Sequence, residues 1–436
     1  MRRGVQSPCR KKVNGCIIQG PGETAVILEG ELVSTLDGGV MSSARGIPRG
    51  VWVLGFVSMF MDISSEMIHS LLPVFMVSAL GASALAVGLV EGVAEATALI
   101  TKVFSGTLSD YLGRRKGLAV FGYGLGALSK PLFALAASVN AVFTARFMDR
   151  IGKGMRGAPR DALVADLTPE PIRGAAYGLR QSLDTVGAFI GPLLAIFLMM
   201  AWSGDFRVVF WFSVIPGVLA VVLLSVGVQE PESVMHDKPK APIYLGVLKQ
   251  LDATYWWVVM IGAVFTLARF SEAFLILRAR QKGLPDAMAP AVFVLMNVIY
   301  ALSAYPIGVL ADRMNRRHLL ISGLFVLIAS DLVLARAQGL AVVAIGIGLW
   351  GLHMGLTQGL LATMVAAAAP AQLRGSAFGF FNLASGIAML VASVLAGLLW
   401  DKIGASATFY AGACFAVAAL ALLTLPTITR GHPPEI

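Results

Sequence analysis

The sequence of 436 residues contains few charged side chains, and this scarcity argues against a soluble globular protein. Asp, Glu, Lys and Arg make up 14% of the residues, whereas hydrophobic residues make up 57%. A soluble domain usually carries about 25% charged residues, because they cover its surface. Since this chain has too little charge to cover a surface in water, we expect lipid to surround it.

Cysteines and catalytic groups are also scarce. The three cysteines, Cys9, Cys16 and Cys414, form neither a metal-ligand spacing nor a disulfide framework. The sequence shows no Ser–His–Asp set and no metal-binding constellation. We therefore expect no metal, no cofactor and no enzymatic activity.

Long apolar runs fill most of the chain. A transmembrane helix needs about 20 apolar residues, so the sequence has room for roughly twelve such helices and predicts an all-α membrane protein. The fourth predicted span is the weakest by hydropathy, because it is full of charges. The predicted spans are 51–80, 84–108, 117–137, 140–163, 174–201, 206–228, 255–277, 288–311, 318–335, 339–367, 375–400 and 405–428.

Polar segments divide the chain into two halves of six spans each. The N-terminal segment is Gly-rich and has no apolar core of a signal peptide, so we expect a poorly ordered tail or an over-extended start before Met41. The predicted organisation is a tail (1–50), a first bundle (51–228), a cytoplasmic linker (229–254), a second bundle (255–428) and a C-terminal tail (429–436).

The net charge of +9 would suggest nucleic acid as a partner if the protein were soluble. Here the basic residues cluster in alternate short loops between apolar spans, which is the positive-inside pattern of membrane proteins. We therefore expect no nucleic-acid partner, and both termini in the cytoplasm. The loop residues are Arg114, Arg115, Lys116, Arg173, Lys238, Lys240, Lys249, Arg313, Arg316, Arg317 and Arg374.

The two halves contain an internal repeat. Two motifs of the first half recur in the second half at nearly the same offset, which indicates parallel halves related by a pseudo-twofold axis along the membrane normal. Such halves enclose a cavity near the midplane. The matches are Gly106, Asp110, Arg114 and Arg115 with Gly308, Asp312, Arg316 and Arg317, and Pro169, Arg173 and Gly174 with Pro370, Arg374 and Gly375.

Three motifs resemble signatures of the major facilitator superfamily. The stretch from Gly106 to Lys116 reads G-x-x-x-D-x-x-G-R-R-K and is similar to its loop between helices 2 and 3. Asn315 replaces the glycine in the second copy. The other two are Arg150, Lys153 and Gly154, similar to the signature of helix 4, and Gly187, Gly191 and Pro192, similar to part of the helix 5 motif of drug–proton antiporters.

The resemblance covers about residues 50–428 and implies a two-bundle fold with rocker-switch transport. It indicates a bacterial twelve-span transporter of the inner membrane, similar to drug–proton antiporters, and a monomer. Leu194 and Ala195 replace the small-residue pair that follows in the helix 5 motif. We expect a helix-packing role for the residues of this fragment, Gly187, Gly191 and Pro192.

The resemblance also implies a gate at the inner end of helix 2. Asp110 would accept hydrogen bonds from the N-terminus of helix 11 while the inner side is closed. Alternatively, the arginines of this loop only anchor the chain to anionic lipid. The predicted gating residues are Gly106, Asp110, Gly113, Arg114, Arg115, Asp312 and Arg316.

Charged residues also occur inside the predicted spans. A charge at the bilayer centre costs at least about 2.5–3.5 kcal/mol on insertion scales, so these side chains should face the bundle interior and be paired. Asp62 and Glu66 share one face of helix 1, and Glu91 and Glu95 repeat their spacing on helix 2. The candidates for proton coupling or the substrate cavity are Asp62, Glu66, Glu91, Glu95, Arg146, Asp149, Arg150, Lys153, Arg180, Asp184, Arg269 and Glu272.

These intramembrane charges allow two interpretations. Close carboxylates in a low dielectric do not both ionise easily, so one of them can load and release a proton as the cavity changes side. Alternatively, the charges are structural ion pairs that lock helices 1, 2, 4 and 5 together. For the cluster as a whole we favour a functional role over a structural one, because a bundle held together by apolar residues would cost less free energy. The second half has fewer polar candidates, so it is expected to offer a more apolar wall.

The leading hypothesis is a proton-coupled transporter that exports small organic molecules by alternating access. One alternative is an uptake permease for an organic anion, which Arg146, Arg150 and Arg156 would bind. Another is a non-transporting membrane sensor or assembly factor built on a transporter fold. The expected partners are a small-molecule substrate, protons and the lipid bilayer.

Overall fold

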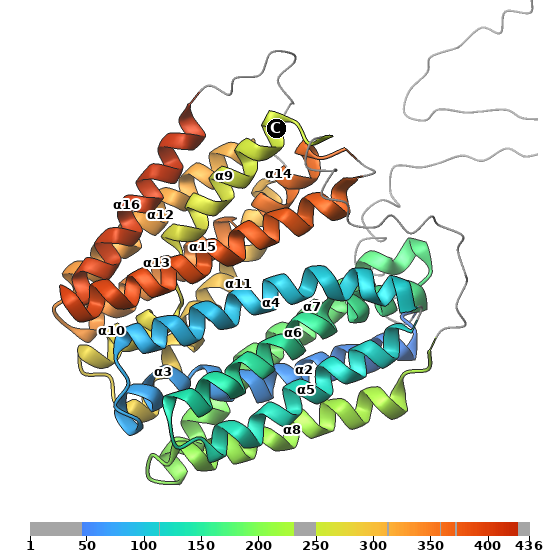
Figure 1. Cartoon of the computed structure of the whole chain (residues 1–436), viewed down its shortest axis with the longest axis horizontal. Coiled ribbons are helices and arrows are strands. Elements are labelled where there is room, and N and C mark those ends of the chain that lie inside the picture. Colours follow the sequence, from blue (N-terminus) through green and yellow to red (C-terminus); the bar gives the residue numbers. More distant parts are fainter. Residues whose placement is uncertain are drawn as a thin grey trace, which may run out of the picture.

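The computed structural model describes residues 46–112, 114–230, 250–311, 314–357, 359–370 and 373–425, and it is helical, with no strand in these ranges (Figure 1). Both predicted tails lie almost wholly outside this part, as do residues 231–249 of the predicted linker. The predicted all-α fold is confirmed. Eleven helical spans are long and apolar enough to cross a membrane in the described part of the chain.

Six long helices form the first bundle, and they alternate in direction. The N-terminal end of α5 and the end of α8 lie close together, since the backbone N–H of Lys116 donates to Glu230 at 3.1 Å. We call this end the linker side and the opposite end the far side. The helices are α2 (Arg49–His69), which continues through α3 (Leu72–Val74) and η1 (Phe75–Ala79), then α4 (Ala84–Leu112), α5 (Arg115–Leu135), α6 (Val139–Leu167), η2 (Glu170–Ile172), α7 (Arg173–Ala201) and α8 (Phe206–Gly227).

The second bundle repeats this arrangement, but two of its spans are interrupted. The helices are α9 (Ala253–Ala268), α10 (Ala273–Gln281), η4 (Asp286–Met288), α11 (Ala291–Ala311), α12 (Arg316–Arg336), α13 (Leu340–Thr357), α14 (Leu360–Ala368), α15 (Arg374–Lys402) and α16 (Ala405–Thr424). The predicted span 255–277 lies within one membrane-spanning segment, Ala253–Gln281, whose helix breaks after Ala268. The freed backbone N–H of Ser271 instead donates to Ser393 Oγ of α15 at 3.2 Å. The predicted span 339–367 breaks at Gly359, whose φ is +74°.

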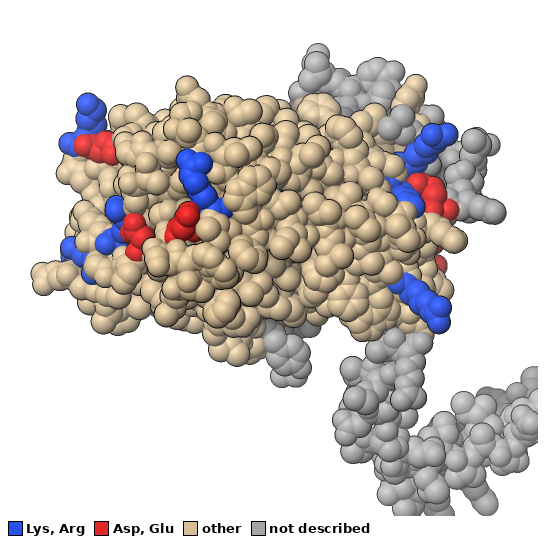
Figure 2. All heavy atoms as spheres, turned by 90° about the horizontal axis from the view of Figure 1, so that it is seen from below, with Lys and Arg blue, Asp and Glu red and all other residues tan. Residues whose placement is uncertain are grey.

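The fourth span is present although its composition is unfavourable. α6 has 29 residues and is long enough to cross the membrane, but its charges keep it out of the eleven apolar spans. Its charged side chains Arg146, Asp149 and Arg150 are buried among the other helices. On the face shown in Figure 2, most charged side chains lie toward the two ends and leave an uncharged band between them. This band fits the hydrocarbon layer of a bilayer.

The two bundles pack closely at the far side. α4 lies against α15 (Figure 1), and a Cβ at Gly88 would collide with the backbone carbonyl of Ser393. The carboxylate of Asp401, at the end of α15, accepts hydrogen bonds from the first backbone N–H groups of α4, Ala84 at 3.1 Å and Leu85 at 2.9 Å. These contacts join the two bundles at the far side, and the cavity described below lies on their linker side.

Candidate functional site

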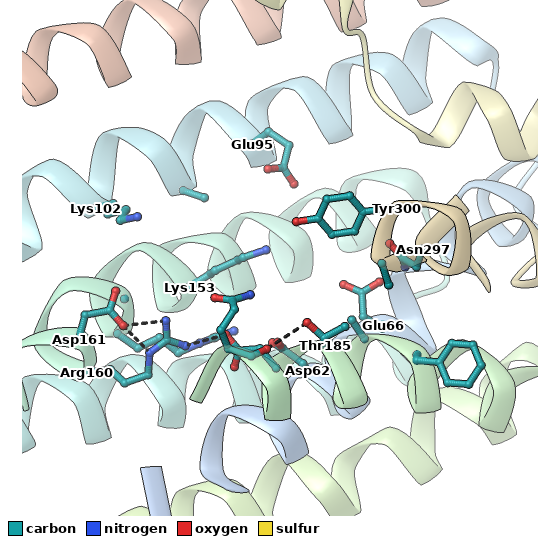
Figure 3. Close-up of a pocket in the computed structure, with 18 of the residues that line it drawn as sticks. Asp62, Glu66, Glu95, Lys102, Lys153, Arg160, Asp161, Thr185, Asn297 and Tyr300 are labelled. Atoms are coloured by element: carbon teal, nitrogen blue, oxygen red, sulfur yellow. Dashed lines mark hydrogen bonds and ion pairs between the residues drawn. The ribbon is translucent and has the colours of Figure 1, made fainter. Parts of the chain in front are cut away.

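A cavity of about 620 Å³ lies between the bundles. α2, α4, α6 and α7 of the first bundle line it, and α11 closes it from the second bundle (Figure 3). The first-bundle wall is charged, whereas the second-bundle wall is mostly apolar. The charged lining residues are Asp62, Glu66, Glu95, Lys102, Lys153, Arg156, Arg160, Asp161 and Asp184, and the α11 residues are Asn297, Val298, Tyr300, Ala301 and Leu302.

Glycines of α7 place two acidic residues on this wall. A Cβ at Gly187 would lie 3.1 Å from the Cβ of Asp62, and a Cβ at Gly191 would lie 2.9 Å from the Cβ of Glu66. The two glycines therefore let α7 approach α2 at the positions from which both carboxylates line the cavity. Sequence reasoning proposed Gly187 and Gly191 as helix-packing residues without identifying this neighbour.

Several predicted site residues lie behind the cavity wall as a buried ion-pair network. Arg146 donates to Glu91 at 2.6 Å, and both side chains are almost fully buried. Arg150 lies 3.1 Å from Glu95, and Asp149 is 3.6 Å from Arg150. Glu91, Arg146, Asp149 and Arg150 do not line the cavity. Since each carries a partner, the network avoids the cost of an unpaired buried charge.

Sequence reasoning missed two members of this network. His69 lies between two carboxylates, 3.6 Å from Glu66 and 3.5 Å from Glu91. The Lys130 ammonium is fully buried and donates to Asp149 at 2.8 Å. His69 follows Glu66 by three residues on the same helix face, and Lys130 stands inside an apolar span, so both signals were readable in the sequence.

A second group of ion pairs lies on the linker-side half of the wall. Arg180 donates to Asp184 at 2.5 Å. Arg160 lies 3.0 Å from Asp161 and 3.8 Å from Asp184, so this side of the cavity is internally neutralised. The predicted pair Arg180 and Asp184 therefore belongs to a larger set that includes two residues of α6.

Four cavity-lining charges have no such partner within the described part of the chain: Asp62, Lys102, Lys153 and Arg156. The carboxylate of Asp62 has no cation within 4.0 Å and no hydrogen bond. The ammonium groups of Lys102 and Lys153 likewise have neither an ion pair nor a hydrogen bond there. In Figure 3 the side chains of Asp62, Lys102 and Lys153 lie on different helices around the same space. Among the described residues the cavity wall thus carries one acid and three bases without an ion pair.

The remaining predicted residues lie elsewhere. Arg269 and Glu272 stand at the break between α9 and α10, do not line the cavity, and form no ion pair with each other among the described residues. In the predicted gating motif, Gly113 and Asp312 lie outside the described residues. Arg115 forms an ion pair with Asp166 of its own bundle. The side chain of Asp110 is not among those described, so its predicted contact with helix 11 stays a prediction.

Two parallel bundles of membrane-spanning helices around a charged cavity are the architecture of a secondary transporter. The comparisons with known proteins agree with this architecture. The sequence model of the Major Facilitator Superfamily matches residues 54–296 and 258–435. The chain therefore belongs to the Major Facilitator Superfamily, whose members are membrane transporters and not enzymes.

Individual relatives cover different shares of the chain. The chain is 30% identical over 379 residues to an uncharacterised MFS-type transporter of Methanocaldococcus jannaschii, covering 86% of this chain and 94% of the relative. It is also 30% identical over 183 residues to the multidrug resistance protein MdtH of Photorhabdus laumondii, covering 42% and 44%. Among solved structures, a POT family transporter in complex with 5-aminolevulinic acid is similar in fold, with a TM-score of 0.73 at 14% identity over 86% of this chain and 95% of that one.

Proposed function

We propose that the chain is a proton-coupled transporter that exports small organic molecules by alternating access, and that Asp62 carries the proton. The observation that carries the proposal is the isolation of Asp62 on the cavity wall. An ionised side chain inside the membrane costs about 2.5–3.5 kcal/mol or more unless it is compensated, and a bound proton removes that charge. Asp62 can therefore exchange a proton with whichever side the cavity faces.

The other carboxylates of the first bundle are poorer candidates. Glu91, Glu95 and Asp149 each have a basic side chain within 3.1 Å or less, and Asp184 pairs with Arg180. A nearby cation holds a carboxylate in its ionised form, so proton binding would have to break the ion pair first. These pairs are better suited to hold α4, α5, α6 and α7 together.

The far-side contacts supply the closed half of the transport cycle. In this state, α4 and α15 meet at Gly88 and Ser393, and Asp401 caps α4, while the cavity lies beyond them. Rocking of the two bundles would break these contacts and close the linker side in exchange. Following the positive-inside pattern, we place the linker side and both termini in the cytoplasm of a bacterial inner membrane.

The direction of export rests on similarity. MdtH, the multidrug resistance protein, resembles nearly half of this chain, and the helix 5 fragment at Gly187, Gly191 and Pro192 resembles that of drug–proton antiporters. The alternative of organic-anion uptake has less support, because Arg146 and Arg150 are bound to carboxylates behind the wall, and of the three arginines only Arg156 lines the cavity.

Everted membrane vesicles test the proposal directly. Substrates come from a growth screen of a deletion strain against toxic compounds and sole nutrients. Vesicles with an acidic interior should accumulate a substrate, and Asp62→Asn should abolish this gradient-driven accumulation. Glu170→Gln is the matched control, because this carboxylate is exposed at the linker side and far from the cavity. Full gradient-driven accumulation by Asp62→Asn would refute the role of Asp62.

A further inference from the structure

The cavity wall shows which charges remain available to a substrate once the internal ion pairs are subtracted. The carboxylates of Glu66, Glu95, Asp161 and Asp184 are all engaged with His69, Arg150, Arg160 or Arg180. What remains without an ion pair among the described residues is Asp62, Lys102, Lys153 and Arg156, which come from three different helices of the first bundle, α2, α4 and α6.

Arg156 differs from the other three, because it is buried in the wall of the cavity. Its side chain is 4% exposed, and its guanidinium lies over the ring of Tyr123 at 5.1 Å from the ring centroid. A Cβ at Gly126 would lie 2.9 Å from one of its terminal nitrogens, so the group is packed against α5. Arg156 is therefore held in the wall by packing, although its guanidinium has no ion pair among the described residues.

The two lysines lie on the same side of the cavity. Lys153 lies near the middle of α6, about 21 Å along the helix from Val139. The side chain of Lys102 reaches the turn of α6 that follows Lys153, since its Cε lies 4.0 Å from a Cβ built at Gly157. Both side chains are exposed to the cavity. Since the described residues give Lys153 no ion pair at this depth, an anionic ligand in the cavity would supply one.

We propose that the substrate is zwitterionic: Lys153 and Lys102 bind its anionic group, Asp62 binds its cationic group, and the apolar face of α11 packs against its body. That face is formed by Val298, Ala301 and Leu302. A cavity of about 620 Å³ has room for such a molecule. This substrate class rests on the proposed function, and it adds the reason for coupling: a proton and the cationic group compete for Asp62.

Substrates with a single charge fit the wall less well. An anion would leave Asp62 without a cation, and a cation would leave the two lysines without an anion. Either case leaves one of the two sites without a partner of opposite charge, whereas a zwitterion supplies a partner to each site. The wall therefore selects for the pair of opposite charges on one molecule.

Three probes that share a rigid aromatic body test this proposal. They are 4-(aminomethyl)benzoate, which carries both charges, 4-methylbenzoate, which carries the anion, and 4-methylbenzylamine, which carries the cation. The full chain is placed in nanodiscs, and tritiated 4-(aminomethyl)benzoate is measured by scintillation proximity, with the two other compounds as competitors. No proton gradient is applied, so this assay does not depend on transport.

We expect saturable binding of the zwitterion, with at least about tenfold weaker competition by either single-charge compound, as the loss of one charge pair predicts. Lys153→Gln and Asp62→Asn should each weaken binding by a similar factor, and Lys153→Arg should restore much of it. Lys402→Gln, at the far end of α15, is the matched control and should bind as the wild type does.

Two results would overturn the zwitterion proposal. One is an absence of saturable binding by the wild type, and the other is a single-charge compound that competes as well as the zwitterion. Either result leaves the proposed function standing if Asp62→Asn still abolishes accumulation in everted vesicles. Conversely, charge-paired binding without gradient-driven accumulation would refute proton coupling and leave the binding site in place.

Discussion

Substitution of Gly88 by alanine should open the far side of the transporter. A Cβ at this position would collide with the backbone carbonyl of Ser393 and lie 3.2 Å from the ring of Phe274. Overpacking of this kind costs about 1–3 kcal/mol. Because a factor of ten corresponds to about 1.4 kcal/mol, the ratio of far-side-closed to far-side-open molecules should fall by about 5- to 150-fold.

Distance measurements between spin labels can detect this shift. One label is placed at Ala137 and the other at Gln338, which are exposed far-side positions of the first and second bundles, after replacement of the native cysteines. In Gly88→Ala the distance distribution should move toward longer separations. Gly124→Ala is the control, because a Cβ there meets nothing within 4 Å. If Gly88→Ala and the control give the same distribution as the unsubstituted chain, the far-side contact is not the closed gate.

Three further predictions concern packing and charge. Arg146→Met leaves the buried carboxylate of Glu91 without its principal cation and should lower the unfolding free energy in SDS titrations by about 3–5 kcal/mol. The double variant with Glu91→Gln should recover most of this loss, and no recovery would contradict the pairing. Asp401→Ala removes the acceptor of two N–H groups of α4 and should weaken far-side closure by about 0.5–2 kcal/mol, seen as a longer spin-label distance. Gly122→Ala places a Cβ 2.7 Å from the backbone nitrogen of Arg156 and should cost about 1–3 kcal/mol in the same titrations, whereas an unchanged stability would contradict the α5–α6 contact.

The fold could be predicted because its signals are local and strong. Apolar runs of membrane-spanning length and the repeat around Gly106 and Gly308 identify two parallel bundles without any tertiary information. The breaks in the second bundle could not be predicted in the same way. The break at Ser271 depends on a hydroxyl of α15 that satisfies the freed backbone N–H, and that contact is distant in sequence.

The site was predictable as a set of charges but not as a set of pairs. Spacing placed Asp62 and Glu66 on one helix face, and the structure has both on the cavity wall. Which charges remain free depends on partners from other helices. Arg146 and Glu91 are 55 residues apart in the chain and bind each other, whereas Lys153 has no partner in the described part of the molecule. Only the three-dimensional packing separates a structural ion pair from a charge that faces a substrate.

Measuring proton release on substrate binding tests most directly whether Asp62 carries the proton. Purified transporter in a weakly buffered solution is mixed with a saturating amount of a substrate from the growth screen, and a pH-indicator dye records the change. If the substrate displaces a proton from Asp62, the wild type should acidify the solution and Asp62→Asn should not. Equal proton release by both proteins would contradict the assignment of Asp62 as the proton carrier.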